Sequence, residues 1–364
     1  MIKVCHISTV HQAFDDRIFY KECHSLVKAG FDVSLVVTHE KEETVNGVKI
    51  IPLPKSKGRL HRMIVKSHFA FYRSLKTKSK IYHFHDPELL FVGVLLSLLG
   101  KKVVYDSHEN VSKQIESKAY IKPAFLRSFI SKGYRLIERI CISFFSSVVS
   151  VTPEIVSFLS VKKGLLLRNF PIISLIDEAK KQEKLTQKKV IFYAGGLSKI
   201  RGIKEVCLAV RNMEMDVELQ LAGPWESEEY KQTCLTIEKD KVNYLGVFPM
   251  EKVYPMMKAA DIGLATLYPV KNYLNSYPIK AFEYMACEKP IIMSNFPYWR
   301  EAFNGFATFV DPYSPRDIQK QIEILLADPT KGKEMGERGR KAVVEKYSWE
   351  AESTKLIDLY KQLV

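Results

Sequence analysis

Short runs of β-branched and aromatic residues alternate with longer amphipathic stretches along the first half of the chain. The runs predict strands, and the stretches between them predict helices, because apolar residues recur there every three or four positions. The predicted strands are Lys3–Ser8, Asp32–Thr38, Val48–Pro52, Ile81–His85, Lys102–Asp106, Ser147–Val151 and Gly164–Leu167. The predicted helices are Phe19–Lys28, Leu60–Thr77, Glu88–Leu98, Pro123–Phe144 and Pro153–Phe158. Such alternation favours a parallel sheet that is covered by helices on both faces.

The same alternation starts again after Ile176–Lys189, a charged segment with few apolar residues that is typical of a linker. The sequence therefore predicts an α/β protein of two Rossmann-like, doubly wound domains facing across a cleft. The predicted boundaries are residues 1–175, residues 176–345, and a last helix, 346–364, that packs back towards the first domain. Ligands of such sheets bind outside the carboxyl ends of the strands, so we expect the site in the cleft.

Composition narrows the class of protein. Hydrophobic residues make up 46% of the 364 residues and charged residues 26%, which is typical of a globular protein. The six cysteines form no CxxC pair, which favours reduced thiols in a cytosolic protein and argues against zinc. The amino terminus shows no leader pattern, and no run of about 18 apolar residues predicts a membrane span.

The positive charge is concentrated in the first half of the chain. The net charge is +14, and residues 1–170 hold 27 Lys and Arg against 14 Asp and Glu, whereas the rest holds 28 against 27. An excess of positive charge on only one half of the chain predicts an anionic partner for that half, such as a membrane surface, nucleic acid or a phosphorylated substrate.

A glycine-rich loop follows the first predicted strand of the second half, in the stretch "VIFYAGGLSKIRGIKEV". Gly195 and Gly196 would let a phosphate approach the backbone, and Lys199 and Arg201 would add positive charge before the next helix. The spacing matches neither a Walker loop nor GxGxxG, which disfavours nucleoside triphosphatases and standard dinucleotide enzymes. A tight turn with solvated lysines is the alternative.

Titratable residues cluster where predicted strands of the first half end. The stretch "IYHFHDPELL" carries His83, His85 and Asp86, and "KKVVYDSHENV" carries Asp106, His108 and Glu109. Such groups are candidates for proton transfer or hydroxyl recognition, although helix caps and satisfied polar residues are the alternative. After the first strand, "TVHQAFDDRIF" adds Asp16 and Arg17, for which a cap with a salt-bridged arginine is an equal alternative.

Nine motifs in order resemble the family 4 retaining glycosyltransferases, which have the GT-B fold. They are "DDRIFYKECHSLVKAGFDVSLV", "HFHDPE", "YDSHE", "YAGGLSKIRGIKE", "LAGP", "YLGVFP", "ADIGLATL", "NSYPIKAFEYMACEKPII" and "YSWE". The resemblance spans nearly the whole chain and is greatest to bacterial enzymes that assemble capsule, O-antigen and other lipid-linked polysaccharides. It implies that the first domain binds the acceptor and the second the nucleotide sugar.

The resemblance also implies roles for single residues. Glu283 matches the second Glu of the family's Glu-x7-Glu motif, which binds the ribose, whereas Asn275 stands where the first Glu contacts the donor sugar. An amide carries no negative charge, so nucleophilic catalysis from Asn275 is disfavoured, but hydrogen bonding to a sugar is retained. Gly196 replaces the family's first phosphate-binding Arg, which leaves Arg201 as the principal cation for the diphosphate, with Lys199 or Lys280 as candidates for the second.

Further positions complete the expected site. His108 matches the family's cleft histidine near the transferred sugar, Phe248 matches the region that receives the base, and the backbone from Ser276 to Ile279 would lie beside the phosphates. The donor-binding set is Gly195, Gly196, Lys199, Arg201, Phe248, Ser276, Tyr277, Pro278, Ile279 and Glu283, and the acceptor or cleft set is Asp16, Arg17, His85, Asp86 and Glu109.

The implied reaction transfers a sugar from a nucleoside diphosphate sugar, with UDP or GDP as the expected carrier, to a lipid-linked saccharide. No cofactor or metal is expected, since cations and backbone amides would stabilise the departing diphosphate. The alternatives are a nucleotide-sugar 2-epimerase, a basic module that binds nucleic acid, and a synthase with a soluble acceptor.

The basic, aromatic segment Lys55–Lys80 bears on the expected location. Together with the net charge of +13 on residues 1–170, this segment predicts a protein on the cytoplasmic face of an anionic membrane. Such a protein would take its acceptor from an isoprenoid diphosphate carrier and would bind no nucleic acid. The alternative is an ordinary amphipathic stretch that packs on its own sheet.

Overall fold

The computed structural model describes residues 1–107, 111–117, 122–151, 153, 164–183 and 187–364. The chain divides into two compact units, and each is described here by itself. Unit 1 contains Met1–Asn169 and Glu350–Val364, and unit 2 contains Phe170–Trp349. The division between the units thus falls six residues before the boundary expected from the sequence.

Unit 1 is built on an eight-stranded sheet with the order β3-β4-β2-β1-β5-β6-β7-β8. Every pairing is parallel except that of β3 with β4. The strands are β1 (Lys3–Gln12), β2 (Asp32–Thr38), β3 (Glu43–Val45), β4 (Val48–Leu53), β5 (Ile81–Phe84), β6 (Lys102–Ser107), β7 (Ser147–Ser150) and β8 (Gly164–Leu166).

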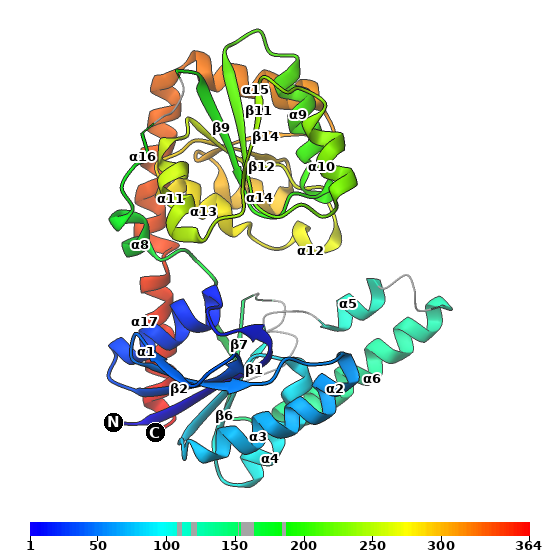
Figure 1. Ribbon diagram of the computed structural model, residues 1–364, viewed down its shortest axis with the longest axis vertical. Helices are drawn as coiled ribbons and strands as arrows, with labels where there is room; N and C mark the ends of the chain where they lie inside the picture. The colour runs from blue at the N-terminus through cyan, green and yellow to red at the C-terminus, as the bar shows by residue number, and fades with distance from the viewer. Residues whose placement is uncertain (108–110, 118–121, 152, 154–163, 184–186) are drawn as a thin grey trace. The chain divides into compact units, whose positions relative to one another are not determined.

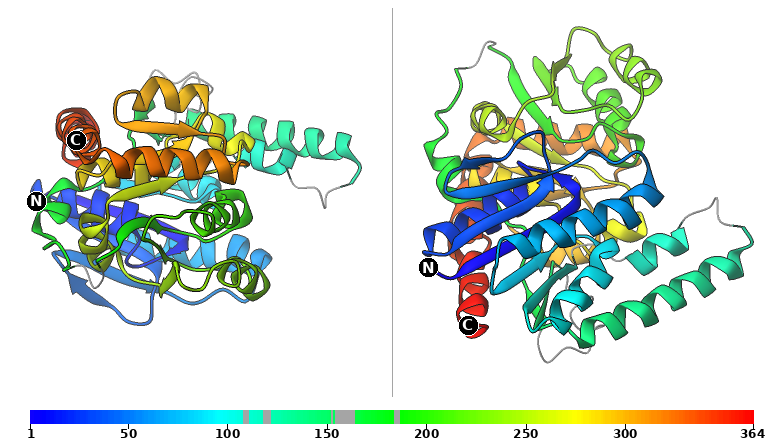
Figure 2. Two further views of the ribbon diagram at one scale, coloured as in Figure 1. Left: turned by 90° about the horizontal axis from the view of Figure 1, so that it is seen from above. Right: turned by 60° about the horizontal axis from the view of Figure 1, so that its bottom comes forward.

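Helices cover both faces of this sheet (Figure 1). They are η1 (Asp16–Cys23), α1 (His24–Lys28), α2 (Arg59–His61), η2 (Arg62–Lys66), α3 (Ser67–Lys76), η3 (Pro87–Leu89), α4 (Leu90–Leu98), α5 (Val111–Ser117), α6 (Ala124–Ser143) and α17 (Trp349–Gln362). One face packs against α3, α4 and α6 through a core that includes Ile7, Phe84 and Ile142. On the other face the α17 residue Tyr360 is buried against Phe31. The two views of Figure 2 show α5 and α6 extending beyond the sheet.

Unit 2 repeats the design with a parallel six-stranded sheet of order β11-β10-β9-β12-β13-β14. Its strands are β9 (Lys189–Ala194), β10 (Val217–Ala222), β11 (Val242–Gly246), β12 (Ile262–Ala265), β13 (Ile291–Ser294) and β14 (Ala307–Val310). Its helices are α8 (Ile173–Glu178), η4 (Lys199–Arg201), α9 (Ile203–Arg211), α10 (Glu228–Leu235), α11 (Met250–Ala259), α12 (Lys271–Leu274), α13 (Ile279–Ala286), α14 (Pro297–Phe303), α15 (Pro315–Ala327) and α16 (Pro329–Lys346). Separate apolar clusters fill its two faces. The prediction of two doubly wound α/β domains is confirmed.

One sequence-based prediction is wrong in part. The expected linker begins inside α8, and Ile176 is fully buried in the core of unit 2 beside Phe170. Ile173 and Ile176 are three residues apart, so one helical face carries both into the core. The charged residues that follow conceal this short amphipathic helix in the sequence. The predicted helix Pro153–Phe158 lies almost wholly outside the described residues.

Across the described residues, every helix is too short or too polar to cross a lipid bilayer.

Candidate functional site

A cavity of about 400 Å³ opens in unit 2 where several parallel strands end. Residues that follow β9, β10, β11 and β12 meet there with the start of α13, as expected for a doubly wound sheet. The lining residues are Ala194, Gly195, Arg201, Ala222, Gly223, Pro224, Val247, Phe248, Met250, Val253, Met257, Leu267, Tyr273, Ser276, Tyr277, Pro278, Ile279, Lys280, Glu283 and Trp299. The cavity is therefore largely apolar, with a few charged groups at its wall.

Two glycines let the strand ends approach each other at this wall. Gly195 has a φ of +133° and Gly223 a φ of +137°, a backbone region that disfavours other residues. A Cβ on Gly223 would overlap the carbonyl group of Gly195, and one on Gly195 would overlap Nζ of Lys280. The first glycine of the predicted phosphate loop is thus required by close packing, and its backbone borders the cavity.

Arg201 reaches the cavity from the end of η4. Its Nη1 lies 3.5 Å from the hydroxyl of Tyr193, and that hydroxyl donates to the carbonyl oxygen of Gly196 at 3.0 Å. The guanidinium is half-buried, as the sequence-based prediction of a cation facing a diphosphate requires. Arginine remains charged at any ordinary pH, so the cavity holds a fixed positive group.

Lys280 brings a second cation and is one of the two lysines that the sequence offers beside Arg201 for the diphosphate. Its Nζ donates to the carbonyl oxygen of Ala194 and lies 4.0 Å from the centroid of the Tyr193 ring. Burial, together with the positive charge of Arg201, lowers the pKa of Lys280 to about 7, although Glu283 acts in the opposite direction. Without a bound anion, this ammonium is therefore only partly protonated near neutral pH.

Glu283 lines the same cavity from α13. The hydroxyl of Tyr254 lies 3.5 Å from its Oε1. The stretch before α13 is fixed by Trp299, whose Nε1 donates to the carbonyl oxygen of Ser276 at 2.7 Å. The first amides of α13 belong to Ile279 and Lys280, both at the cavity wall, and the amino end of a helix favours an anion.

Most of the expected donor-binding residues thus come together. Three residues of the expected donor and catalytic sets do not line the cavity: Gly196, Lys199 and Asn275. Lys199 lies instead in a separate hollow with Glu205 and Tyr230. Asn275 is exposed at the end of α12. His108 and Glu109 lie outside the described residues.

The expected cleft residues of unit 1 are mostly buried. Nε of Arg17 donates to Oδ2 of Asp106 at 2.7 Å, and Nδ1 of His85 lies 3.3 Å from the same oxygen. Asp86 accepts hydrogen bonds from the backbone amide of Thr9 at 2.5 Å and from other groups at the end of β1. Asp16 is more exposed and pairs with Lys21 at 2.6 Å. Arg17 and His85 are therefore held by Asp106, and Asp86 by the end of β1, which is the alternative that the sequence left open.

The sequence analysis did not single out His6, Glu22 or Tyr360, which contact this buried group. Tyr360 places its hydroxyl 2.7 Å from Nδ1 of His83 and 3.2 Å from Nε2 of His6. The sequence offered one signal for His6, a histidine inside a hydrophobic strand. The structure shows that this histidine pairs in register with His83 of β5.

Comparison with known proteins finds that the chain is similar to glycosyltransferases. Residues 176–342 match the family model "Glycosyl transferases group 1". The chain is 20% identical over 298 residues to "MMP alpha-(1->4)-mannosyltransferase" of Mycolicibacterium hassiacum, and the match covers 77% of this chain and 70% of that protein. Two other curated relatives are matched over only 48% and 45% of their own length.

Solved structures support the fold. Sucrose-phosphate synthase from Thermosynechococcus elongatus superposes with a TM-score of 0.78 at 18% identity, covering 100% of this chain and 99% of that chain. Anabaena HepE in complex with UDP-glucose superposes with a TM-score of 0.72 at 11% identity, covering 100% of both chains. These neighbours have the GT-B architecture, and the family match together with the named relatives supports a hexosyltransferase.

Proposed function

We propose that the chain transfers a sugar from a nucleoside diphosphate sugar to a lipid-linked saccharide, with retention of configuration, in the synthesis of a surface polysaccharide such as capsule or O-antigen. The observation that carries the donor half of the proposal is the convergence of Arg201, Lys280 and Glu283 on one apolar cavity. UDP or GDP is the proposed carrier. The UDP-glucose complex of the structurally similar HepE adds support for a nucleotide of this class.

The charged groups suit the parts of such a donor. Arg201, the ammonium of Lys280 and the first amides of α13 offer donors and positive charge for the diphosphate, whose negative charge grows as the sugar departs. Glu283 offers carboxylate oxygens to the ribose hydroxyls, and Phe248 offers an apolar surface to the base. Asn275 carries no charge, so front-face attack by the acceptor hydroxyl is proposed rather than a covalent intermediate on this residue.

Loss of the Glu283 carboxylate should weaken binding of the ribose-bearing donor. A hydrogen bond to a charged group contributes about 1.5–3 kcal/mol, so Glu283→Ala is expected to raise the Kd for UDP or GDP at least tenfold. Calorimetric titration measures this change, and inorganic pyrophosphate, which lacks ribose, should bind the variant and the parent equally. Glu251→Ala, at an exposed position outside the cavity, is the control. An unaltered nucleotide Kd in folded Glu283→Ala would contradict the ribose assignment.

Nucleotide binding should depend on pH through Lys280. The folded protein has a pKa of about 7 there, below that of an ordinary lysine, so above pH 7 the empty cavity holds mostly neutral amine. A bound diphosphate favours the ammonium, which means that binding takes up a proton. The Kd is then expected to rise by up to about tenfold per pH unit above 7.

Titration of UDP from pH 7.5 to 8.5 tests this pH dependence, since in that range the diphosphate is ionised and the uracil ring is still neutral. Lys280→Met should remove the slope. The same slope in this variant would assign the proton uptake to another group.

The acceptor half of the proposal depends on a surface of unit 1. Large apolar side chains are exposed along α2, η2, α3, α4 and α6: Leu60, Met63, Ile64, Val65, Phe69, Tyr72, Phe91, Leu95, Leu98, Phe125, Phe129, Ile130, Leu136, Ile137 and Ile140. We call this set the apolar helix surface. Leu60, Phe125 and Phe129 are each 74% exposed, so packing on the sheet does not account for them.

Cations accompany these side chains on the same helices: Arg59, Arg62, Arg73, Lys76, Arg127, Lys132, Arg135 and Arg139. Helices α3 and α4 contact each other, as do α4 and α6, which makes the surface continuous. Exposed apolar groups beside basic ones suit the interface of an anionic membrane. We therefore propose a peripheral protein on the cytoplasmic face of the cell membrane, where an isoprenoid diphosphate carrier would present the acceptor.

A further inference from the structure

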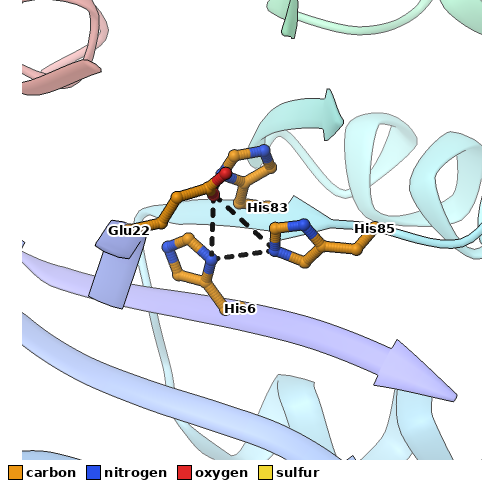
Figure 3. A group of neighbouring side chains, drawn as sticks. All are labelled: His6, Glu22, His83 and His85. Carbon is orange, nitrogen blue, oxygen red and sulfur yellow. Dashed lines mark hydrogen bonds and ion pairs between the residues drawn. The ribbon is translucent and has the colours of Figure 1, made fainter. Parts of the chain in front are cut away.

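Three histidines and a glutamate converge inside unit 1 (Figure 3). His6 comes from β1, His83 from β5, His85 from the residue that directly follows β5, and Glu22 from η1. Successive residues of a strand point to opposite faces, and His6 pairs in register with His83, so the three imidazoles share the face that η1 covers. All four side chains are buried, with exposed fractions of 0–1%.

The ligand atoms of these side chains lie close enough together to surround one metal ion after local adjustment. Nδ1 of His6 lies 3.0 Å from Nε2 of His85 and 3.9 Å from Oε2 of Glu22. The same carboxylate oxygen lies 4.0 Å from Nε2 of His85 and 3.6 Å from Nδ1 of His83. A tetrahedral zinc ion with bonds of about 2.0–2.1 Å has ligand atoms about 3.3 Å apart. All four ligand atoms lie within 4.8 Å of one another, so the longest separation would have to shorten by more than an ångström to reach that geometry.

Neighbouring groups fix the orientation of the imidazoles, as such groups do for metal-bound histidines in other proteins. The Nδ1 of His85 lies 3.3 Å from a carboxylate oxygen of Asp106, which leaves Nε2 as the ligand atom. The Nε2 of His6 lies 3.2 Å from the hydroxyl of Tyr360, which leaves Nδ1 facing the centre. A carboxylate or hydroxyl behind a histidine fixes its tautomer and raises its strength as a ligand.

Glu22 has the properties of a ligand whose partner is a cation. Within the described part of the chain, neither of its oxygens accepts a hydrogen bond. Nε of Arg17 lies 3.1 Å from Oε1 but is also 2.7 Å from Oδ2 of Asp106, to which it donates. Burial of this carboxylate is costly, because its ion pair with Arg17, which Asp106 shares, replaces only part of the hydration that it has lost. A cation at the centre of the cluster would remove that cost.

We propose that His6, Glu22, His83 and His85 bind a divalent transition metal of the zinc class at a closed, structural site. Imidazoles and one carboxylate suit Zn²⁺ and Co²⁺, whereas Mg²⁺ requires an octahedral shell of oxygens. His83 would join as the fourth ligand by exchanging its contact with Tyr360 for the metal. The site ties β1, β5 and η1 together, is independent of the donor cavity, and departs from the sequence-based expectation of no metal.

A hydrogen-bonded chain without metal is the rival arrangement. Asp106 would accept from His85, His85 from His6, His6 from Tyr360, and Tyr360 from His83, with each imidazole neutral. This chain leaves Nε2 of His83 without a hydrogen-bond partner among the described residues, and burial raises the pKa of Glu22, which favours a neutral carboxyl group beside Asp106. The two arrangements differ in whether the protein takes up metal.

Metal content at controlled free Zn²⁺ distinguishes them. Full-length protein is stripped with a chelator, dialysed against buffered micromolar Zn²⁺ or millimolar Mg²⁺, and assayed by elemental analysis and by thermal unfolding. We expect about one Zn²⁺ per chain and a higher melting temperature with Zn²⁺ but not with Mg²⁺. Folded wild-type protein that retains less than about a tenth of an equivalent of Zn²⁺ would overturn the proposal.

Variants locate the bound metal. Glu22→Gln, which keeps the shape of the side chain, and His6→Ala should each lower Zn²⁺ content at least tenfold and remove the thermal shift. The matched control changes the partly buried pair of His39 and Glu43, in which Nε2 of His39 lies 2.7 Å from Oε1 of Glu43 and which offers the same ligand types. His39→Ala should retain the metal. Full Zn²⁺ content in folded Glu22→Gln and His6→Ala, or its loss in His39→Ala, would refute the assignment.

Discussion

Arg201→Ala should bind UDP or GDP at least ten times more weakly than the parent protein. Arg201 supplies the permanently charged group at the wall of the unit 2 cavity, whereas Lys280 is only partly charged near neutral pH. A charge-assisted hydrogen bond contributes about 1.5–3 kcal/mol, and each 1.4 kcal/mol corresponds to a factor of ten. The loss should extend to inorganic pyrophosphate, because the diphosphate itself loses its partner.

Lys199→Ala is the matched control for Arg201→Ala. It removes a cation two residues earlier in the same loop, yet Lys199 lies in a different hollow. Calorimetry on both variants, with circular dichroism to verify folding, separates a specific contact from a general loss of charge. Equal weakening of binding in the two variants would mean that Arg201 acts only through the overall positive charge of the loop. Unchanged binding in Arg201→Ala would exclude the assignment of Arg201 to the phosphates.

Binding to anionic vesicles should be lost when the apolar helix surface is made acidic. Leu60, Ile64, Phe125 and Phe129 are 69–74% exposed, so their replacement by Asp should not disturb the core of unit 1. Burial of each such side chain in a membrane stabilises binding by about 1.5 kcal/mol or more, and four lost contacts predict a fall in partitioning of well over a hundredfold. Co-sedimentation with vesicles that contain anionic lipid measures it.

Val344→Asp provides the control, since Val344 is an exposed apolar residue of unit 2. This variant should sediment with anionic vesicles as the parent does. The parent should bind neutral vesicles less well and should dissociate from anionic ones as salt is added. Equal sedimentation of the parent and the variant with four Asp substitutions would contradict the proposal that the apolar helix surface binds membranes. The absence of any binding by the parent would contradict it as well.

Much of the fold could be predicted because hydrophobic residues recur along the chain with the spacing of strands or of helices. The strands of both sheets, such as Asp32–Thr38 and Val217–Ala222, are read directly from hydrophobic runs between turn residues. Helix α8 escaped prediction because Ile173 and Ile176 are followed at once by a charged segment. A helix of six residues has too few apolar positions to show a period.

The candidate site was only partly predictable, for a different reason. Arg201 and Glu283 belong to recognisable motifs, but Lys280 becomes a site residue through its position beside Tyr193 and Ala194, which are distant in sequence. The polar cluster of unit 1 likewise requires the pairing of β1 with β5 and the contact with Tyr360 from the end of the chain. Such juxtapositions follow from topology rather than from local sequence.

Binding of nucleotide sugars to the full-length protein shows whether the unit 2 cavity is a donor site. A panel of UDP and GDP sugars is titrated calorimetrically into wild-type protein and into Arg201→Ala and Glu283→Ala. The account predicts micromolar binding of at least one donor, competition by the matching nucleoside diphosphate, and at least tenfold weaker binding in both variants. Folded wild-type protein that binds no nucleotide sugar, or that binds one with an affinity indifferent to both substitutions, would contradict the assignment of the unit 2 cavity as the donor site.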